Sequence, residues 1–183
     1  MRVGLIGRGI GDAAYLAQAG AEVLVVDAAP QEVMQRAVDA LAAYINITFK
    51  FGPYDFKDFK DADLVVVGAG TPLEEPVLVE CKKAGVRLVQ SAALFAEISQ
   101  VPIIGITGTR GKSTVTHMIH HVLSVTTGEK ILLGGNVRGV SNLQLLNEVD
   151  EDSLCVMELD SWQLQGFGWA GISPAVAVFT NLM

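Results

Sequence analysis

Short, uninterrupted apolar runs recur along the chain, and they restrict its fold more than any other feature of the sequence. Residues 64–67 and 175–179 are examples. Runs of this length are too short to cross a bilayer, but they match strands that are buried on both faces of a parallel sheet. Segments with helical apolar spacing lie between them. The alternation therefore predicts an α/β fold built from doubly wound, mostly parallel sheets.

The alternation restarts once, so we expect the 183 residues to form two doubly wound units. The turn at residues 99–102 is the expected boundary, which gives a first domain of residues 1–98 and a second domain of residues 99–183. The sequence ends directly after a core-like strand at residues 175–180. We therefore expect the chain to stop partway through the second domain. The strand edges left open by such a stop predict self-association.

Residues 103–114 join an apolar strand to a Gly-rich turn that ends in Lys-Ser, and a helical pattern follows. Gly108 and Gly111 allow a tight turn, and the start of the next helix directs its positive end toward an anion. This pattern predicts a nucleotide-phosphate site. The residues assigned to it are Gly108, Thr109, Arg110, Gly111, Lys112, Ser113 and Thr114.

This turn is a variant of the strict P-loop, because Ile106 occupies the position of that motif's first glycine. Lys112 is expected to reach the β- and γ-phosphates, and the Ser113 hydroxyl is expected to ligate Mg²⁺. A Gly-rich turn with a surface lysine and no ligand remains the alternative.

Two further segments of the second domain are candidates for the same site. Glu158 ends an apolar strand, and in open α/β sheets that end of a strand faces the ligand crevice. A carboxylate there is positioned to complete the coordination of Mg²⁺ together with Ser113. Asn136 follows two glycines at another strand end, where it either contacts a substrate oxygen or only supplies a turn residue.

A second Gly-rich turn, at residues 7–12, follows the first strand, and Asp27 closes the next strand. The pattern resembles a dinucleotide fingerprint, except that Asp12 replaces its third glycine. A carboxylate in the first helical turn would repel a pyrophosphate. We favour a nucleotide-type ligand held through its base or ribose over NAD(P). Glycines that only allow close strand–helix packing are the third interpretation.

Charge and side-chain chemistry exclude several classes of function. The net charge of −7 argues against binding to a nucleic-acid backbone. Cys81 and Cys155 have no metal-like spacing and are expected to be reduced thiols of a cytoplasmic protein. His117 and His121 lie four residues apart on one helix, but no acidic residue accompanies them, so surface histidines are expected rather than a metal site.

Three segments together resemble a known family: residues 105–113, residues 134–136 and residues 158–164. In this order they are similar to the ATP-dependent Mur ligases of bacterial peptidoglycan synthesis. The last segment, Glu-Leu-Asp-Ser-Trp-Gln-Leu, is most similar to the D-glutamate-adding MurD branch. Residues 180–182, Thr-Asn-Leu, resemble the start of a further family segment.

The resemblance implies a Rossmann-like UDP-binding domain followed by a truncated P-loop ATPase-type domain. It also implies addition of D-glutamate to UDP-N-acetylmuramoyl-L-alanine through an acyl phosphate, with ATP and Mg²⁺ as cofactors. Lys112 and Glu158 would serve catalysis, and Asn136 would contact the muramoyl substrate. The implied UDP-binding residues are Gly7, Arg8, Gly9, Ile10, Asp27 and Ala28. The family also implies a cytoplasmic monomer for the full ligase, with no membrane or nucleic-acid partner.

The sequence departs from the family pattern at Asp160 and in the turn at residues 68–72. The resemblance further implies that the ligands of a second Mg²⁺ and the amino-acid-binding domain would lie beyond Met183. The chain is therefore not expected to complete a ligation. A MurC-like ligase, a non-catalytic nucleotide-binding module and an NAD-dependent dehydrogenase are the alternatives.

Overall fold

The computed structural model describes residues 1–7 and 9–183, which form two compact units, Met1–Ser91 and Ala92–Met183. Each unit is built on one parallel sheet, so the expected fold class is confirmed. The division falls seven residues before the boundary expected at residues 98 and 99. Helix α4 (Ser91–Ser99) is therefore grouped with the second unit, because the division follows packing and not the turn at residues 99–102.

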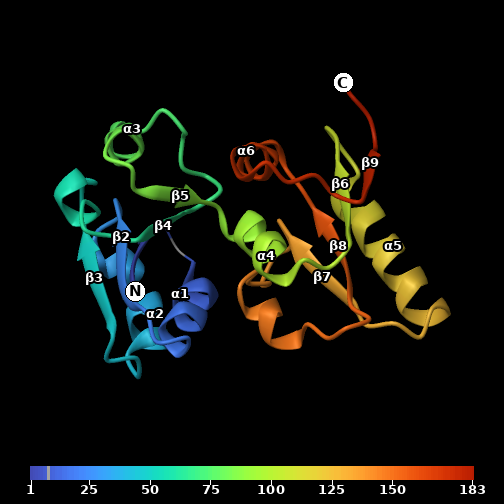
Figure 1. Ribbon diagram of the computed structural model, residues 1–183, viewed down its shortest axis with the longest axis horizontal. Coiled ribbons are helices and arrows are strands. Elements are labelled where there is room, and N and C mark those ends of the chain that lie inside the picture. The colour runs from blue at the N-terminus through green and yellow to red at the C-terminus, as the bar shows by residue number, and fades with distance from the viewer. Residues whose placement is uncertain (8) are drawn as a thin grey trace. The chain divides into compact units, whose positions relative to one another are not determined.

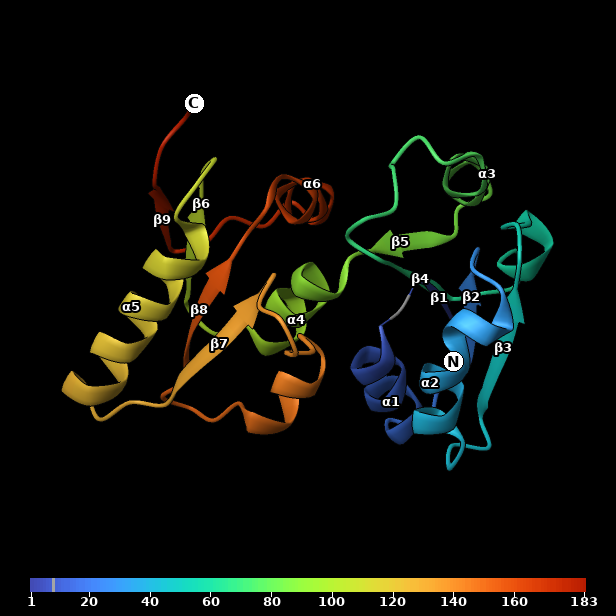
Figure 2. The same ribbon diagram turned by 180° about the vertical axis from the view of Figure 1, so that it is seen from behind.

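The first unit contains a five-stranded parallel sheet in the order β3-β2-β1-β4-β5. Helices α1 and α2 pack against each other, and α3 packs against β5. In both views α3 lies on the opposite side of the sheet from α1 and α2 (Figures 1 and 2). The elements are β1 (Arg2–Ile6), α1 (Ile10–Gln18), β2 (Glu22–Asp27), α2 (Gln31–Leu41), β3 (Ile47–Phe51), the 3₁₀ helix η1 (Phe56–Asp58), β4 (Leu64–Val67), α3 (Pro76–Lys83) and β5 (Arg87–Val89).

The central strands of this sheet are buried on both faces, as their apolar runs predict. All four residues of β4 are buried, and so are the last four residues of β1. Phe59, fully buried, lies so close to β1 that a Cβ on Gly4 would be 2.5 Å from its ring. A glycine is required there because β1 and the segment after η1 share one layer of the core.

The second unit contains a four-stranded parallel sheet in the order β7-β8-β6-β9. Both views place α5 on one side of this sheet and α4 and α6 on the other (Figures 1 and 2). Opposite sides are expected, since α5 and α6 belong to crossovers that run in opposite directions along the sheet. The elements after α4 are β6 (Ile103–Thr107), α5 (Lys112–Thr126), β7 (Ile131–Gly135), the 3₁₀ helix η2 (Gln144–Glu148), β8 (Leu154–Glu158), α6 (Ser161–Ala170) and β9 (Val176–Phe179).

Helix α5 and strand β9 of the second unit leave apolar side chains exposed to solvent. Thr116 is the one buried residue of α5, while Met118 and Val125 are exposed. Strand β9 is at the sheet edge, and Val176 and Phe179 are exposed on it. An apolar edge strand without charged residues is the structural condition for the self-association that the sequence predicts.

Most predicted elements exist, with ends shifted by a few residues. The sequence also predicts a helix around residues 141–147, and this prediction was wrong in type, because the structure has the short 3₁₀ helix η2 there. The segment is short and its leucines supply local apolar contacts, which a 3₁₀ turn satisfies as well as an α-helix does. No helix among the described residues is both long enough and apolar enough to span a membrane.

Gln90, directly after β5, is an unusual member of the core. Its side chain is 1% exposed, and neither Nε2 nor Oε1 has a hydrogen-bond partner among the described residues. An unpaired buried amide of this kind destabilises the folded state by about 1–3 kcal/mol.

We expect Gln90→Met to raise the free energy of unfolding by about 1–3 kcal/mol, because methionine fills a similar volume without polar atoms that need partners. Urea denaturation followed by circular dichroism measures the change. Gln144→Met, at an exposed glutamine, is the control and should change little. A lower stability for Gln90→Met would show that the amide has a partner that stabilises the fold.

Candidate functional site

Strand β6 leads into a four-residue turn, residues 108–111, and helix α5 begins at Lys112. Gly108 has φ +134° and Gly111 has φ +79°, which are backbone conformations that favour glycine. A Cβ on Gly108 would also overlap Thr180 Oγ1. Both glycines are therefore required for the turn that brings the start of α5 to the carboxyl end of the sheet.

The start of α5 presents free hydrogen-bond donors. Among the described residues, no acceptor is recorded for the backbone N–H groups of residues 111–114, and Val115 is the first to donate, to the Gly111 carbonyl at 2.9 Å. Ser113 and Thr114 are exposed beside them. Free N–H groups at the positive end of a 15-residue helix are suited to hold an anion.

The Lys112 side chain bends back over the turn. Its Nζ donates to the Gly108 carbonyl at 3.0 Å, which uses one of the three ammonium donors. The helix below it is fixed by Thr116, which is fully buried and donates its hydroxyl to the Lys112 carbonyl at 2.8 Å. The ammonium group is thus held close to the free N–H groups and retains donors for a ligand.

Glu158 ends β8, and it pairs in register with Ile106 of β6. The residue as a whole is only 4% exposed, and no hydrogen-bond or ion-pair partner for its carboxylate is found among the described residues, so its oxygens keep a small contact with solvent at the strand end. A carboxylate with no neutralising partner at the carboxyl end of a strand is available as an oxygen ligand for a cation. Ile106 itself is fully buried within β6, and the turn begins after that strand ends at Thr107.

The segment after β7 meets the end of β8. Gly135 has φ +83°, and a Cβ there would overlap the Glu158 carbonyl oxygen. Asn136 donates its backbone N–H to that same oxygen at 2.7 Å, and its side chain is exposed. Asn142, which the sequence did not single out, accepts from the Gly135 N–H at 2.7 Å and is buried. The structure therefore brings Asn136 and Glu158 together at the carboxyl ends of β7 and β8.

In the first unit, the predicted residues gather at the carboxyl ends of β1 and β2. Gly7 has φ +98° and donates to the Val26 carbonyl at 3.1 Å, and Gly9 directly precedes α1. Ile10 and Ala28 are exposed at the same edge. Arg8 lies outside the described residues.

Asp27 is buried at the end of β2, and its Oδ1 accepts from the Ala29 N–H at 2.8 Å. The loop after β4 reaches this edge as well, since a Cβ on Gly68 would lie 2.7 Å from the Ile6 carbonyl oxygen. Asp12 occupies the first turn of α1, as expected. The carboxyl end of the first sheet therefore combines closely packed backbone segments with the buried carboxylate of Asp27.

Tyr54 is a member of this edge that the sequence did not indicate. Burial, and after it the negative charge of Asp27, raise the pKa of the Tyr54 phenol, while a hydrogen bond from the Ala28 backbone lowers it. The phenol therefore lies near both predicted ligand-binding residues and stays neutral. Tyr54 is separated from Asp27 in the sequence by α2 and β3 and belongs to no local motif, so only the fold reveals its place.

Other candidates have structural explanations. His120 has its Nε2 3.0 Å from the Ile131 carbonyl oxygen, and His117 and His121 are exposed. The described residues contain no group of three or more potential metal ligands. Asp160 forms a capping box with Gln163 at the start of α6, where the Asp160 carboxylate accepts from the Gln163 N–H at 2.8 Å. Its departure from the family pattern is thus accounted for by helix capping.

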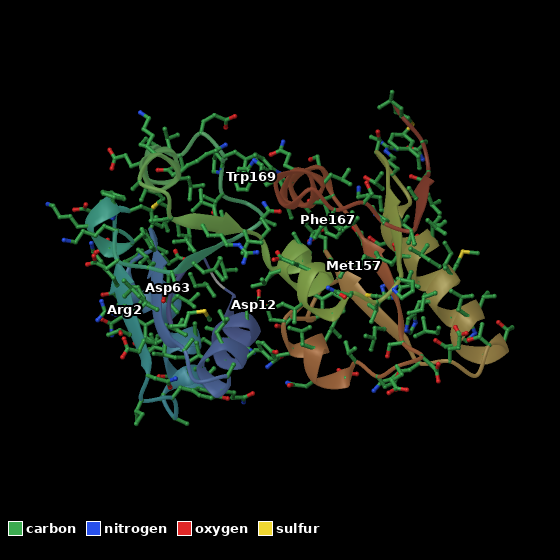
Figure 3. All side chains as sticks on the ribbon, in the orientation of Figure 1. Arg2, Asp12, Asp63, Met157, Phe167 and Trp169 are labelled. Carbon is green, nitrogen blue, oxygen red and sulfur yellow. The ribbon has the colours of Figure 1, made fainter. Side chains whose placement is uncertain are left out.

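The cysteines and tryptophans take no part in the site. Both thiols are free and buried, and burial raises the pKa of Cys155 to about 12 and also raises that of Cys81. They are protonated near neutral pH and are poor nucleophiles. Trp162 and Trp169 are each 38% exposed on α6, whereas Phe167 of the same helix is buried (Figure 3).

A groove of about 280 Å³ lies at the amino ends of β1 and β2. Arg2 and Asp63, labelled in Figure 3, belong to this end of the sheet, whereas Asp12 lies at the carboxyl end. Ligands of open α/β sheets bind at the carboxyl ends of strands, so the groove is not the candidate site.

Comparison with known proteins gives two matching family descriptions. Residues 2–90 match the Mur ligase MurD-like N-terminal domain, and residues 106–183 match the Mur ligase middle domain. Curated relatives include the UDP-N-acetylmuramoylalanine–D-glutamate ligase of Borreliella burgdorferi, 32% identical over 100% of this chain, and that of Desulfotalea psychrophila, 34% identical over 97%. The chain spans 39% of the length of either relative.

Solved structures of the same family share the fold. The ligase that joins UDP-N-acetylmuramate to L-alanyl-γ-D-glutamyl-meso-diaminopimelate in Neisseria meningitidis matches with a TM-score of 0.58 at 21% identity, over all of this chain and 60% of that one. The UDP-N-acetylmuramate–alanine ligase of Thermotoga maritima matches with a TM-score of 0.57 at 21% identity, over all of this chain and 41% of that one.

Gly135 provides a test of the close approach of β7 to β8. We expect Gly135→Ala to destabilise the second unit by clearly more than the about 1–2 kcal/mol that a left-handed non-glycine residue costs, because its Cβ also overlaps the Glu158 backbone. Gly139→Ala is the matched control, since Gly139 has φ +82° and open space around it. Urea denaturation of both variants gives the comparison. Equal losses would contradict the close approach.

Proposed function

Because the chain belongs to the Mur ligase family, we propose that it carries the substrate-binding and nucleotide-binding parts of a ligase that adds D-glutamate to UDP-N-acetylmuramoyl-L-alanine. The family descriptions cover both units. Support for D-glutamate comes from the names of the curated relatives, which match along nearly the whole chain. The chain spans 39% of their length, so complete turnover is proposed for the longer protein only.

One observation carries the proposal: the carboxylate of Glu158 has no partner among the described residues and ends the strand next to the one that leads into residues 108–111. Beyond that turn, the N–H groups of residues 111–114 are free. A site that combines anion-binding N–H groups with an unneutralised carboxylate suits an anion bound together with a divalent cation. Mg-ATP has this composition.

The described residues fit a magnesium ion. The Glu158 carboxylate and the Ser113 hydroxyl are both oxygen donors, which Mg²⁺ prefers, and neither has another recorded partner for these oxygens among the described residues. When bound, Mg²⁺ supplies positive charge that offsets the charge of the nucleotide phosphates. Lys112 adds a second positive charge from the start of α5.

The proposed reaction has two transfers. The carboxylate of UDP-N-acetylmuramoyl-L-alanine attacks the γ-phosphorus of ATP, the bond to ADP breaks, and an acyl phosphate forms. The amine of D-glutamate then attacks the acyl carbon, phosphate leaves, and the new amide loses a proton. In the first transfer Lys112 and the free N–H groups stabilise negative charge on the equatorial phosphate oxygens. No covalent bond to the protein is needed.

Substrate binding divides between the units in this proposal. The exposed Asn136 side chain contacts the muramoyl substrate from the sheet edge that also holds Glu158. The UDP group binds at the carboxyl edge of the first sheet, where Gly7, Gly9 and Ile10 meet Asp27 and Ala28, together with Arg8. A cytoplasmic location, which the family resemblance implies, is part of this proposal.

We expect Glu158→Gln to weaken binding of Mg-ATP about tenfold to a hundredfold, because the amide cannot replace a charged ligand of the cation. Binding of ATP without Mg²⁺ should not change. Lys112→Ala should weaken both, since it removes a charge that acts on the phosphates directly. Isothermal titration calorimetry of this chain, with and without Mg²⁺, measures the affinities.

Glu129→Gln, at an exposed glutamate on the loop before β7, is the matched control and should bind Mg-ATP as the wild type does. The melting temperature of Glu158→Gln should not fall, since the carboxylate has no partner to lose. Unchanged Mg-ATP affinity in Glu158→Gln would refute the assigned role. Binding of NADH in place of ATP would favour the dehydrogenase alternative.

A further inference from the structure

The segment directly after β9 lies against the phosphate-binding turn. Residues 180 and 181 follow the edge strand, which pairs with β6 so that Thr107 is level with Phe179. Thr180 continues this pairing by donating its N–H to the Thr107 carbonyl at 2.9 Å. The chain thus carries Thr180 and Asn181 to the turn formed by residues 108–111.

Asn181 makes three hydrogen bonds with two consecutive residues of the turn. Its backbone carbonyl accepts from the Thr109 N–H at 2.9 Å, and its Oδ1 accepts from the Arg110 N–H at 3.1 Å. Its Nδ2 donates to the Arg110 carbonyl at 3.0 Å. One asparagine therefore occupies both polar groups of the Arg110 backbone and the N–H of Thr109.

The Thr180 hydroxyl adds to this contact. Its Oγ1 lies 2.7 Å from the Arg110 carbonyl oxygen and 3.2 Å from that of Thr107, so its single proton is donated to the nearer Arg110 oxygen or shared between the two. Gly108 is packed so closely on it that any side chain at that position would overlap Oγ1. The turn is thus held at both its first and its third residue.

These contacts divide the N–H groups of the turn into two sets. Those of Thr109 and Arg110 are used by Asn181, while no acceptor is recorded for those of residues 111–114 among the described residues. A turn that contains two glycines loses much conformational freedom when a ligand orders it. Contacts that order it beforehand reduce that loss and so strengthen binding.

We propose that Asn181 and Thr180 are positioning residues that hold the turn of residues 108–111 in its bent form before a nucleotide binds, so that only the N–H groups of residues 111–114 face the phosphates. This inference rests on the proposed function for its effect on Mg-ATP, but the holding of the turn itself does not. Neither residue touches the reacting atoms; both act through the turn.

Two measurements on the whole chain separate these parts. Amide hydrogen exchange reports the turn directly: the Arg110 amide should be protected in the wild type and should exchange at least tenfold faster in Asn181→Ala. Calorimetry with Mg-ATP reports the consequence: Asn181→Ala should weaken binding about tenfold to a hundredfold, while the melting temperature changes little. Asn147→Ala, at an exposed asparagine, is the matched control.

The role of the Thr180 hydroxyl can be tested with a substitution that keeps the shape of the side chain. Thr180→Val has the same shape without the hydroxyl and should weaken Mg-ATP binding, whereas Thr180→Ser keeps the hydroxyl and should restore most of the affinity. A purely structural role for β9 would lower the melting temperature in the valine and alanine variants and leave the affinity of the folded protein unchanged.

The outcomes test separately whether Asn181 holds the turn and whether the chain binds Mg-ATP. An unprotected Arg110 amide in the wild type, or equal exchange in Asn181→Ala, would overturn the inference. Unchanged Mg-ATP affinity in Asn181→Ala would overturn it as well. Failure of the wild type to bind Mg-ATP would contradict the proposed function, and the exchange experiment would still decide whether Asn181 holds the turn.

Discussion

Parallel pairing of β6 with β8 is the interaction on which the candidate site depends. It sets Ile106 level with Glu158, so the strand that ends in a carboxylate lies beside the strand that leads into the phosphate-binding turn. The carbonyl of Glu158 is bound by Asn136, and its approach to Gly135 leaves no space for a side chain. Three strand ends are thereby fixed to each other by backbone groups, and the side chains of Glu158 and Asn136 remain available for ligands.

The fixed backbone gives the site its charge balance. Glu158 is 4% exposed as a residue, and no protein partner neutralises its carboxylate among the described residues, so that carboxylate is available to a cation. The start of α5 and Lys112, which follow the neighbouring strand β6, supply positive charge. These charges are the basis for proposing a magnesium nucleotide, which combines a cation with an anion, as the ligand of the site.

The sequence predicted the structure best where a local motif alone determines the backbone conformation. The strand, the glycines and the Lys-Ser pair of residues 103–114 predicted the turn and the start of α5, and the apolar runs predicted two parallel sheets. Contacts between distant segments were not predictable in this way. Asn181 was noticed only as part of a family-like string, yet it is bound to Thr109 and Arg110, about seventy residues earlier. Asn142 and Tyr54 likewise obtain their places from the fold, because neither belongs to a motif.

The central claim is that the second unit binds Mg-ATP at the start of α5 beside Glu158. An NMR titration of the ¹⁵N-labelled chain with Mg-ATP tests it most directly, since every backbone amide reports its own environment. We expect the largest shifts at the amides of residues 111–114, with further shifts at Glu158 that require Mg²⁺. Shifts confined to residues 7–10 of the first unit would contradict binding at the start of α5, because they would place the nucleotide at the other Gly-rich turn.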